Sequence, residues 1–165
     1  MRIPYRKPGK FSQLAPDPMI TQNKFLELKN KLAKLKQIQP PAVAEVARLA
    51  ELGDFSENAE YQMAKGRLRG INNSILKLEN QINQAQIINI QATDTVQLGN
   101  VVTVESENKQ KKYQILGSTE TDPKKGIISH HSPIGSALMG REVGDIVTIK
   151  LENREIKYKI INISY

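Results

Sequence analysis

The sequence predicts an α+β protein in which an antiparallel coiled-coil helical hairpin precedes a small antiparallel β domain with one short helix. Before residue 90, apolar residues recur at alternating steps of three and four in two segments joined by a short turn. After residue 90, short runs of β-branched residues alternate with Gly, Asn, Asp and Pro. A chain of 165 residues can hold two such units. We expect an arm over 1–20, a hairpin over 21–90 and a β domain over 91–165.

Composition and charge limit the class of protein. The chain has no cysteine and nothing that resembles a signal peptide or a span of roughly 20 apolar residues, so we expect a cytoplasmic protein. A net charge of +7 favours a polyanionic partner. Residues 1–91 contain 14 Lys+Arg against 8 Asp+Glu, whereas residues 92–165 contain 10 against 9, so the basic character belongs to the first half.

Residues 1–20 combine four basic residues with five of proline or glycine, a composition that builds neither a helix nor a central strand. We predict an extended basic arm. It is either a solvated tail or a contact to nucleic acid or to a large protein partner.

The first helix is expected to begin after Thr21, a suitable N-cap residue. Its apolar seam continues to Leu49 with Gln39 as the one polar member. Because proline lacks an N–H and crowds the preceding turn, we predict a kink or break at Pro40 and Pro41.

The second helix is predicted over 57–86, a length of roughly 45 Å at 1.5 Å per residue. In antiparallel helices, the position numbers of opposing residues sum to a constant. Every seam residue of one helix here has a counterpart in the other at a sum of 110, for example 25 with 85 and 49 with 61. The spacing therefore predicts a hairpin that turns at 53–57.

Five β-rich runs are expected to form the second domain, at 101–104, 113–116, 126–129, 146–149 and 156–163. Ser132 and Pro133, followed by apolar residues and then Gly140, predict one short capped helix between strands.

The turn of the hairpin contains two carboxylates, Asp54 and Glu57, three positions apart. Asp54 or Ser56 is a natural N-cap, and Glu57 suits the positive end of a helix dipole, so both acidic residues have a structural explanation. The alternative is functional. Two carboxylates that face solvent can complete a Mg²⁺ site supplied mainly by a partner, although neither residue holds a metal tightly alone.

Basic residues flank this turn and are the candidates for contacting a nucleic-acid backbone by charge. They are Arg48 on the first helix and Lys65, Arg67 and Arg69 on the second. A solvated basic face explains them equally well. Tyr61 fits the apolar seam better than a stacking platform.

Two stretches resemble the bacterial Gre elongation factors, the GreA/GreB family. One runs from Gly53 through Asp54, Ser56, Glu57 and Asn58 to Tyr61, with Lys65, Arg67 and Arg69 following. The other runs from Lys125 to Asp145 and contains Ser132, Pro133, Ile134, Ala137 and Leu138. The resemblance covers residues 21–165.

The resemblance implies a coiled coil that enters the secondary channel of bacterial RNA polymerase and an FKBP-like domain that docks at its rim. Asp54 and Glu57 would share the catalytic Mg²⁺ with the polymerase, while Ser56 and Asn58 support the tip. Arg48, Lys65, Arg67 and Arg69 would bind nucleic acid near the nascent RNA 3′ end, and Ser132, Pro133, Ile134, Ala137 and Leu138 would contact polymerase. Such a factor stimulates RNA cleavage by the polymerase, is not itself an enzyme, and is expected to act as a monomer without a membrane partner or a cofactor of its own.

Three other readings remain open. A Gfh-type inhibitor would use the same channel, but such inhibitors carry a more acidic tip than this chain. An adaptor whose second domain is a prolyl isomerase would need an aromatic pocket, and the chain has five Tyr, three Phe and no Trp. An autonomous metal nuclease would need converging ligands, whereas His130 and His131 lie far along the chain from the acidic turn. Since adjacent histidines in a strand point to opposite faces, we interpret them as surface or loop residues.

Overall fold

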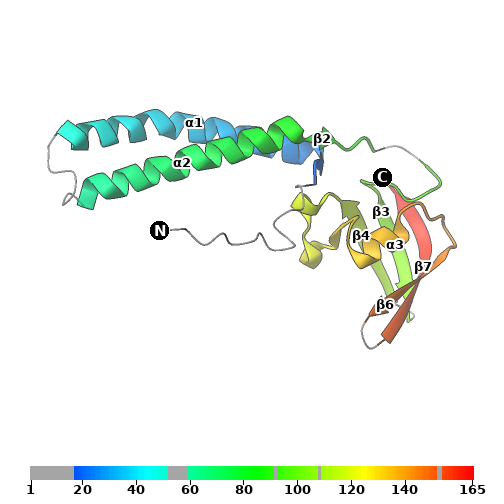
Figure 1. Ribbon diagram of the computed structural model, residues 1–165. Coiled ribbons are helices and arrows are strands. Elements are labelled where there is room, and N and C mark those ends of the chain that lie inside the picture. Colours follow the sequence, from blue (N-terminus) through cyan, green and yellow to red (C-terminus); the bar gives the residue numbers. More distant parts are fainter. Residues whose placement is uncertain (1–16, 52–58, 91–92, 108, 152–153) are drawn as a thin grey trace, which may run out of the picture. The chain divides into compact units, whose positions relative to one another are not determined.

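The computed structural model describes residues 17–51, 59–90, 93–107, 109–151 and 154–165, shown in Figure 1. These residues form two compact units. The hairpin unit is Met19–Asn89, and the β unit combines Asp17 and Pro18 with Ile90–Tyr165. The predicted fold class is confirmed, because a helical hairpin is followed by a β domain with one short helix.

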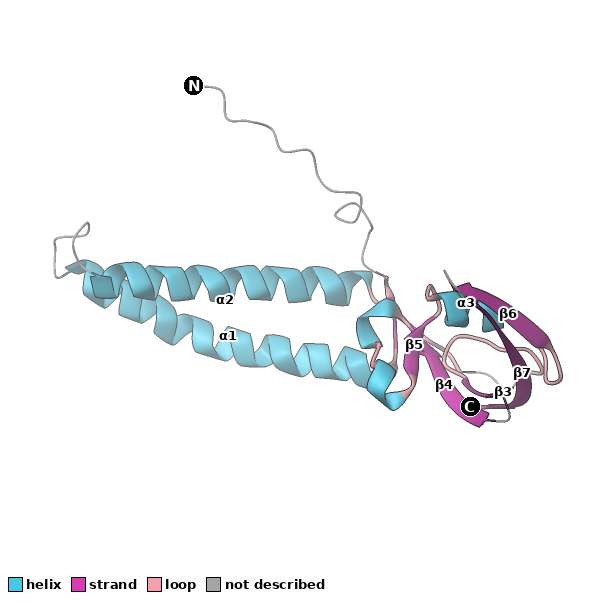
Figure 2. Ribbon diagram, turned by 90° about the horizontal axis from the view of Figure 1, so that it is seen from below, coloured by secondary structure: helices cyan, strands magenta, loops and turns pink. Residues whose placement is uncertain are grey.

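The hairpin consists of α1 (Gln22–Glu51) and α2 (Ala59–Gln84), which run side by side in opposite directions (Figures 1 and 2). The residues buried along their interface are the predicted seam residues Leu28 and Leu49 of α1 and Ile75 and Leu78 of α2. Packing of an apolar stripe on each helix stabilises both, because a lone helix of this composition gains little from propensity alone.

Two predictions about the first helix, its N-cap and its interruption at the prolines, can be compared with the structure. Thr21 caps α1, since its Oγ1 accepts a hydrogen bond of 3.2 Å from the Lys24 N–H. We predicted a kink or a break at Pro40 and Pro41, and the break is wrong, because α1 is continuous through both prolines. The polar seam residue Gln39 lies beside them and donates to Asn72 Oδ1 of α2 at 2.8 Å. Contacts with α2 on both sides of the prolines hold the helix together across the missing hydrogen bonds.

A pair of two-residue strands closes the open end of the hairpin. The strand β1 (Met19–Ile20) pairs in parallel with β2 (Gln86–Ile87). Ile20 is only 1% exposed and packs with Leu28 and Leu78 in one buried cluster. Residues 19 and 20, which were predicted to end the arm, therefore belong to the hairpin. The helix α2 ends at Gln84, two residues before the end predicted for it, because the chain then extends into β2.

The β unit contains a five-stranded sheet with the order β5-β4-β3-β7-β6. Its strands are β3 (Val101–Ser106), β4 (Lys109–Leu116), β5 (Ile127–Ser129), β6 (Ile146–Leu151) and β7 (Arg154–Ser164). Each of the five predicted runs corresponds to one strand, although β5 begins one residue after its run, which was predicted from Gly126. Pairing is antiparallel except between β4 and β5, which are parallel. Two short 3-10 helices, η2 (Ser118–Glu120) and η3 (Pro123–Lys125), make that connection possible.

The predicted short helix is α3 (Pro133–Leu138). It packs on the sheet through Leu138, which joins Val102, Val104 and Ile160 in the core of the β unit, all at 0% exposure. Neither α1, α2 nor α3 is apolar enough over sufficient length to cross a bilayer, a finding that covers the described residues.

Candidate functional site

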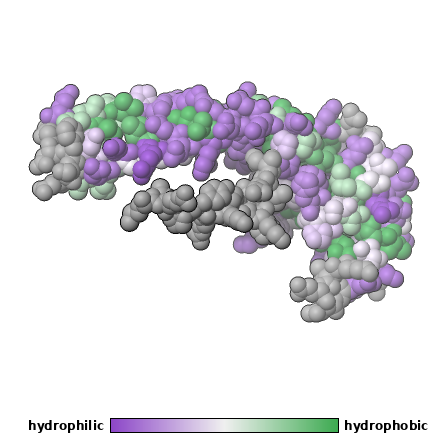
Figure 3. Space-filling view, in the orientation of Figure 1, coloured by the Kyte–Doolittle hydropathy of each residue, from purple (hydrophilic) through white to green (hydrophobic). Residues whose placement is uncertain are grey.

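The predicted acidic tip lies outside the described residues. Asp54, Ser56, Glu57 and Asn58 all fall within 52–58, the segment that links the end of α1 at Glu51 to the start of α2 at Ala59. On the face seen in Figure 3, the hairpin presents hydrophilic side chains over much of its length, with a group of hydrophobic side chains near the end where α1 stops and α2 starts.

Arg48, the predicted basic residue of α1, is exposed and paired with an acidic neighbour. Its guanidinium donates to both carboxylate oxygens of Glu45, at 2.9 and 3.1 Å. This hydrogen bonding lowers the pKa of Glu45 and raises the pKa of Arg48 from their ordinary values. An anion that approaches Arg48 must therefore compete with Glu45, which weakens Arg48 as a candidate for phosphate binding.

The basic residues of α2 do not form one group. Lys65 and Arg69 are four positions apart and therefore lie on the same face of the helix, both exposed. Arg67 lies on another face. It lines a shallow depression of about 280 Å³ together with Glu45 and Leu49 of α1 and Glu60, Met63 and Ala64 of α2. The face of Lys65 and Arg69 is therefore the stronger candidate for a nucleic-acid contact.

Tyr61 is half-buried, as expected for a seam residue. The Lys65 Nζ lies 5.8 Å from the centre of its ring, close enough for a weak cation–π attraction. This contact helps to hold the Lys65 ammonium group near the turn end of the hairpin.

The five residues predicted to contact polymerase lie at α3 but differ in exposure. Pro133 is exposed, and Ser132, Ile134 and Ala137 are partly exposed. Leu138 is 0% exposed and belongs to the core, so it supports this surface from below and offers no contact of its own.

Two local interactions fix the start of α3. The Ser132 hydroxyl donates to the Ser129 carbonyl oxygen at 2.6 Å and accepts from the Gly135 N–H at 3.0 Å. A Cβ at Gly135 would lie 2.1 Å from the Ser129 carbonyl oxygen, so only glycine allows this close approach. The loop from Ser129 to Ser132 is thereby tied to the helix that follows.

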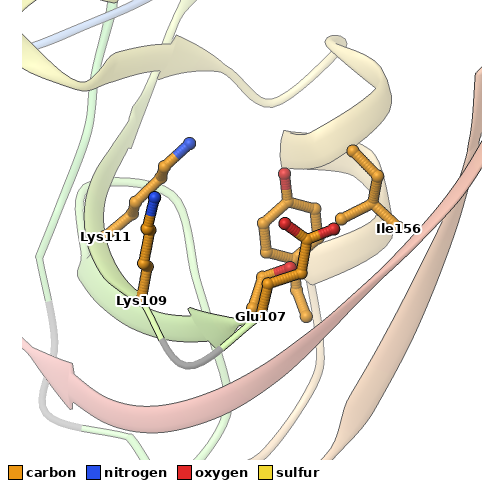
Figure 4. A pocket seen from close by; sticks show the side chains of 6 residues that line it. Glu107, Lys109, Lys111 and Ile156 are labelled. Carbon is orange, nitrogen blue, oxygen red and sulfur yellow. The ribbon is translucent and has the colours of Figure 1, made fainter.

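A second depression lies on the β unit, between the ends of β3 and β4 and the strand β7. Figure 4 shows Lys109 and Lys111 side by side on one wall, with Glu107 and Ile156 on the other. Its volume of about 180 Å³ is below the range of roughly 300–1,000 Å³ typical for small-molecule sites. We assign no ligand to it.

A polar cluster around Asp17 was missed at the level of sequence. Asp17 Oδ2 accepts from the Ser118 N–H at 2.8 Å and from the Ser118 hydroxyl at 3.1 Å, and the His130 Nδ1 lies 3.6 Å away. His130 and His131 lie in the turn after β5, which confirms a loop position. Their rings do not point to opposite faces, because their centroids are 3.8 Å apart. No spacing signal predicts the cluster, since 101 residues separate Asp17 from Ser118.

Comparison with known proteins identifies the family. Residues 18–87 match the model of the N-terminal domain of the transcription elongation factors, and residues 91–165 match the model "Transcription elongation factor, GreA/GreB, C-term". The transcription elongation factor GreA of Clostridioides difficile is 41% identical over 128 residues, which are 74% of this chain and 80% of that protein. GreA of Maricaulis maris is 42% identical over 123 residues, 72% of this chain and 78% of that protein.

Solved structures give a weaker likeness. Gfh1 of Thermus thermophilus is 22% identical, with a TM-score of 0.42 over 90% of this chain and 99% of that one. A GreA/GreB factor from Nitrosomonas europaea is 19% identical, with a TM-score of 0.41 over 89% and 98%. The two family models together span both structural units, and the sequence relatives cover most of the chain. The chain therefore belongs to the GreA/GreB family of transcription elongation factors.

Proposed function

We propose that this protein inserts its helical hairpin into the secondary channel of bacterial RNA polymerase and stimulates cleavage of the RNA 3′ end in backtracked complexes. The observation that carries the proposal is the match of both family models, in order, to the hairpin unit and the β unit. The hairpin supports it physically. Its helices of 30 and 26 residues are long for the surface that they bury, and a long, thin element is suited to reaching a distant site.

The tip residues Asp54 and Glu57 would act by binding and positioning a Mg²⁺ ion. Carboxylate oxygens are the ligands that Mg²⁺ prefers, and a Mg²⁺ ion shared with the polymerase would lower the pKa of a bound water and stabilise charge on the phosphate. Asp54 and Glu57 would contribute two of its ligands. Ser56 and Asn58 would hold the turn that presents them. The protein thus adds ligands to an active site that belongs to the polymerase and is not an enzyme by itself.

Two surfaces would position the factor. Lys65 and Arg69, on one exposed face of α2, would attract the phosphates of the extruded RNA. The exposed part of α3, with Pro133 at its start and Ile134 beside it, would contact polymerase at the rim of the channel. Both surfaces contribute binding energy, whereas the tip contributes to the chemical step.

RNA cleavage in stalled, backtracked elongation complexes tests the proposal. The complexes are incubated in Mg²⁺ with wild-type protein, Asp54→Ala, Glu57→Ala or no factor. Glu51→Gln is the matched control, because Glu51 is an exposed acidic residue at the end of α1 outside the proposed tip set. We expect wild-type and Glu51→Gln proteins to accelerate cleavage, and the two tip variants to lose about 100-fold or more of the stimulation.

Binding to polymerase is measured in the same samples by competition with labelled wild-type protein. Tip variants that bind normally but fail to stimulate cleavage support the proposed role of the carboxylates. Wild-type protein that binds polymerase yet slows cleavage would instead indicate an inhibitor that uses the same channel.

A further inference from the structure

We propose that Asp17, His130 and His131 form a binding site for a divalent transition-metal ion of the Zn²⁺ type in the β unit. Each residue offers one ligand atom, and the three atoms lie within 4.8 Å of one another. The site uses none of the residues of the acidic tip and does not depend on the proposed action at polymerase.

The geometry is close to that of a zinc site. Ligand atoms at about 2.0–2.1 Å from a tetrahedral zinc lie about 3.3–3.4 Å apart. Asp17 Oδ2 and His130 Nδ1 are 3.6 Å apart, close to the separation of two ligands of one ion. Nδ1 also lies 3.3 Å from the Leu116 carbonyl oxygen, so metal binding uses the tautomer of His130 with its proton on Nε2. His131 is exposed and lies in a turn, so rotation of its side chain can bring its ring into the third position.

The donor types select the class of metal. Two imidazoles and one carboxylate suit Zn²⁺, Co²⁺ or Ni²⁺, whereas Mg²⁺ and Ca²⁺ prefer oxygen ligands alone. The chain contains two histidines and no cysteine, so these two rings are its entire supply of imidazole and thiolate ligands. A fourth position would remain for water.

Supporting hydrogen bonds orient the ligands. The Ser118 N–H and hydroxyl hold Asp17 Oδ2, and the hydroxyls of Ser118 and Ser129 are 3.0 Å apart. The Ser129 hydroxyl in turn accepts from the His131 N–H at 3.0 Å. Hydrogen-bonded partners behind the ligands are a regular feature of protein metal sites, because they fix ligand orientation and reduce the cost of ordering.

Burial of Asp17 adds an electrostatic argument. Its side chain is only 4% exposed, and that of His130 is 20% exposed. A carboxylate removed from water is costly unless cationic or hydrogen-bonding partners compensate, and a bound dication is a strong compensating partner. His130 and His131 directly precede Ser132, the N-cap of α3, so a bound ion would hold the loop from which α3 starts.

Metal binding is tested on the full-length protein with Zn²⁺ by calorimetry, and with Co²⁺ by visible absorption, which reports ligand number and type. The variants are His131→Asn, His130→Asn and Asp17→Asn. Asp122→Asn is the control, because Asp122 is a carboxylate of the same unit that pairs with Lys125 outside the cluster. His131→Asn changes an exposed side chain, so its effect is separable from misfolding.

We expect one Zn²⁺ per chain for wild-type and Asp122→Asn proteins, together with a Co²⁺ spectrum of low coordination number. Each variant of the three ligands should weaken Zn²⁺ binding about tenfold or more. Lack of Zn²⁺ binding by the wild-type protein would overturn the proposal. So would affinity that survives His131→Asn and His130→Asn, or a stoichiometry of one ion per two chains, which would indicate a bridge between surface histidines.

Discussion

At the scale of single residues, Gly135 is the position where the backbone leaves least room. A methyl group there would approach the Ser129 carbonyl oxygen to 2.1 Å, so the loop or the helix must move. We predict that Gly135→Ala destabilises the β unit by about 1–3 kcal/mol, measured by urea denaturation. Ser136→Ala, at the exposed neighbouring position of α3, serves as the control and should change stability by less than about 0.5 kcal/mol.

The pair of Glu45 and Arg48 yields a prediction about pH. Hydrogen bonding from Arg48 lowers the pKa of the Glu45 carboxyl from its ordinary value in the folded protein. Its contribution to folding is therefore present above the unfolded pKa and is lost as the pH falls through the folded pKa. In a titration followed by carboxyl ¹³C NMR, the Glu45 pKa should lie below that of an unpaired glutamate and rise in Arg48→Gln. A Glu45 pKa that is the same in both proteins would exclude the pair in solution.

Roles that depend on neighbouring residues in the chain, such as helix caps, could be predicted from the sequence, whereas contacts between residues far apart in the chain could not. Thr21 and Ser132 were predicted as caps because a cap depends on the next three residues. The Asp17 cluster was missed because its members meet only after the β unit has folded. Leu138 was predicted at a surface, but the spacing of a six-residue helix does not show which side faces the core.

At the scale of elements, the continuity of α1 through Pro40 and Pro41 can be tested directly. Both prolines are exposed, so replacement by alanine leaves no cavity and restores two backbone donors inside the helix. We predict that the double alanine variant stabilises the hairpin by a few kcal/mol, given that proline costs about 3 kcal/mol in a helix interior. Thermal unfolding followed at 222 nm measures this change. An unchanged midpoint would mean that the helix is interrupted at these residues.

The two faces of α2 yield a second prediction at this scale. Lys65→Ala with Arg69→Ala removes two charges from one face and should raise the factor concentration needed for half-maximal cleavage, with a weaker dependence on salt. Arg67→Ala, on the other face, should have a smaller effect because Arg67 lies near Glu45. Lys77→Ala, an exposed position farther along α2, controls for net charge. Equal effects of all three changes would contradict a specific RNA-facing side.

Periodicity predicted the hairpin well because eight seam pairs repeat one geometric relation. The rule that proline interrupts a helix failed at Pro40 and Pro41, because a rule for an isolated helix omits the stabilisation that α2 supplies on both sides. Periodicity failed for β1 and β2, because strands of two residues carry no periodicity and pair across the whole length of the hairpin. The parallel pairing of β4 and β5 was missed for a similar reason, as its crossover consists of two 3-10 turns that resemble loops in sequence.

At the scale of the whole molecule, the division into two units separates two tasks. The hairpin unit provides length, while the β unit has a core of its own and presents α3. The family could be identified from two motifs in the sequence, one in each unit. Their order along the chain, and the match of both family models, make the assignment independent of the exact structure of residues 52–58.

The central claim is that Asp54 and Glu57 complete a Mg²⁺ site in the polymerase. The most direct measurement is the RNA cleavage rate of backtracked complexes as a function of Mg²⁺ concentration, at saturating factor, for wild-type protein, Asp54→Asn and Glu57→Gln. If the carboxylates are ligands, wild-type protein should lower the Mg²⁺ concentration for half-maximal cleavage relative to polymerase alone, and each variant should raise it again by about tenfold or more. A half-maximal concentration that is the same with wild-type factor, with the variants and without factor would contradict the claim.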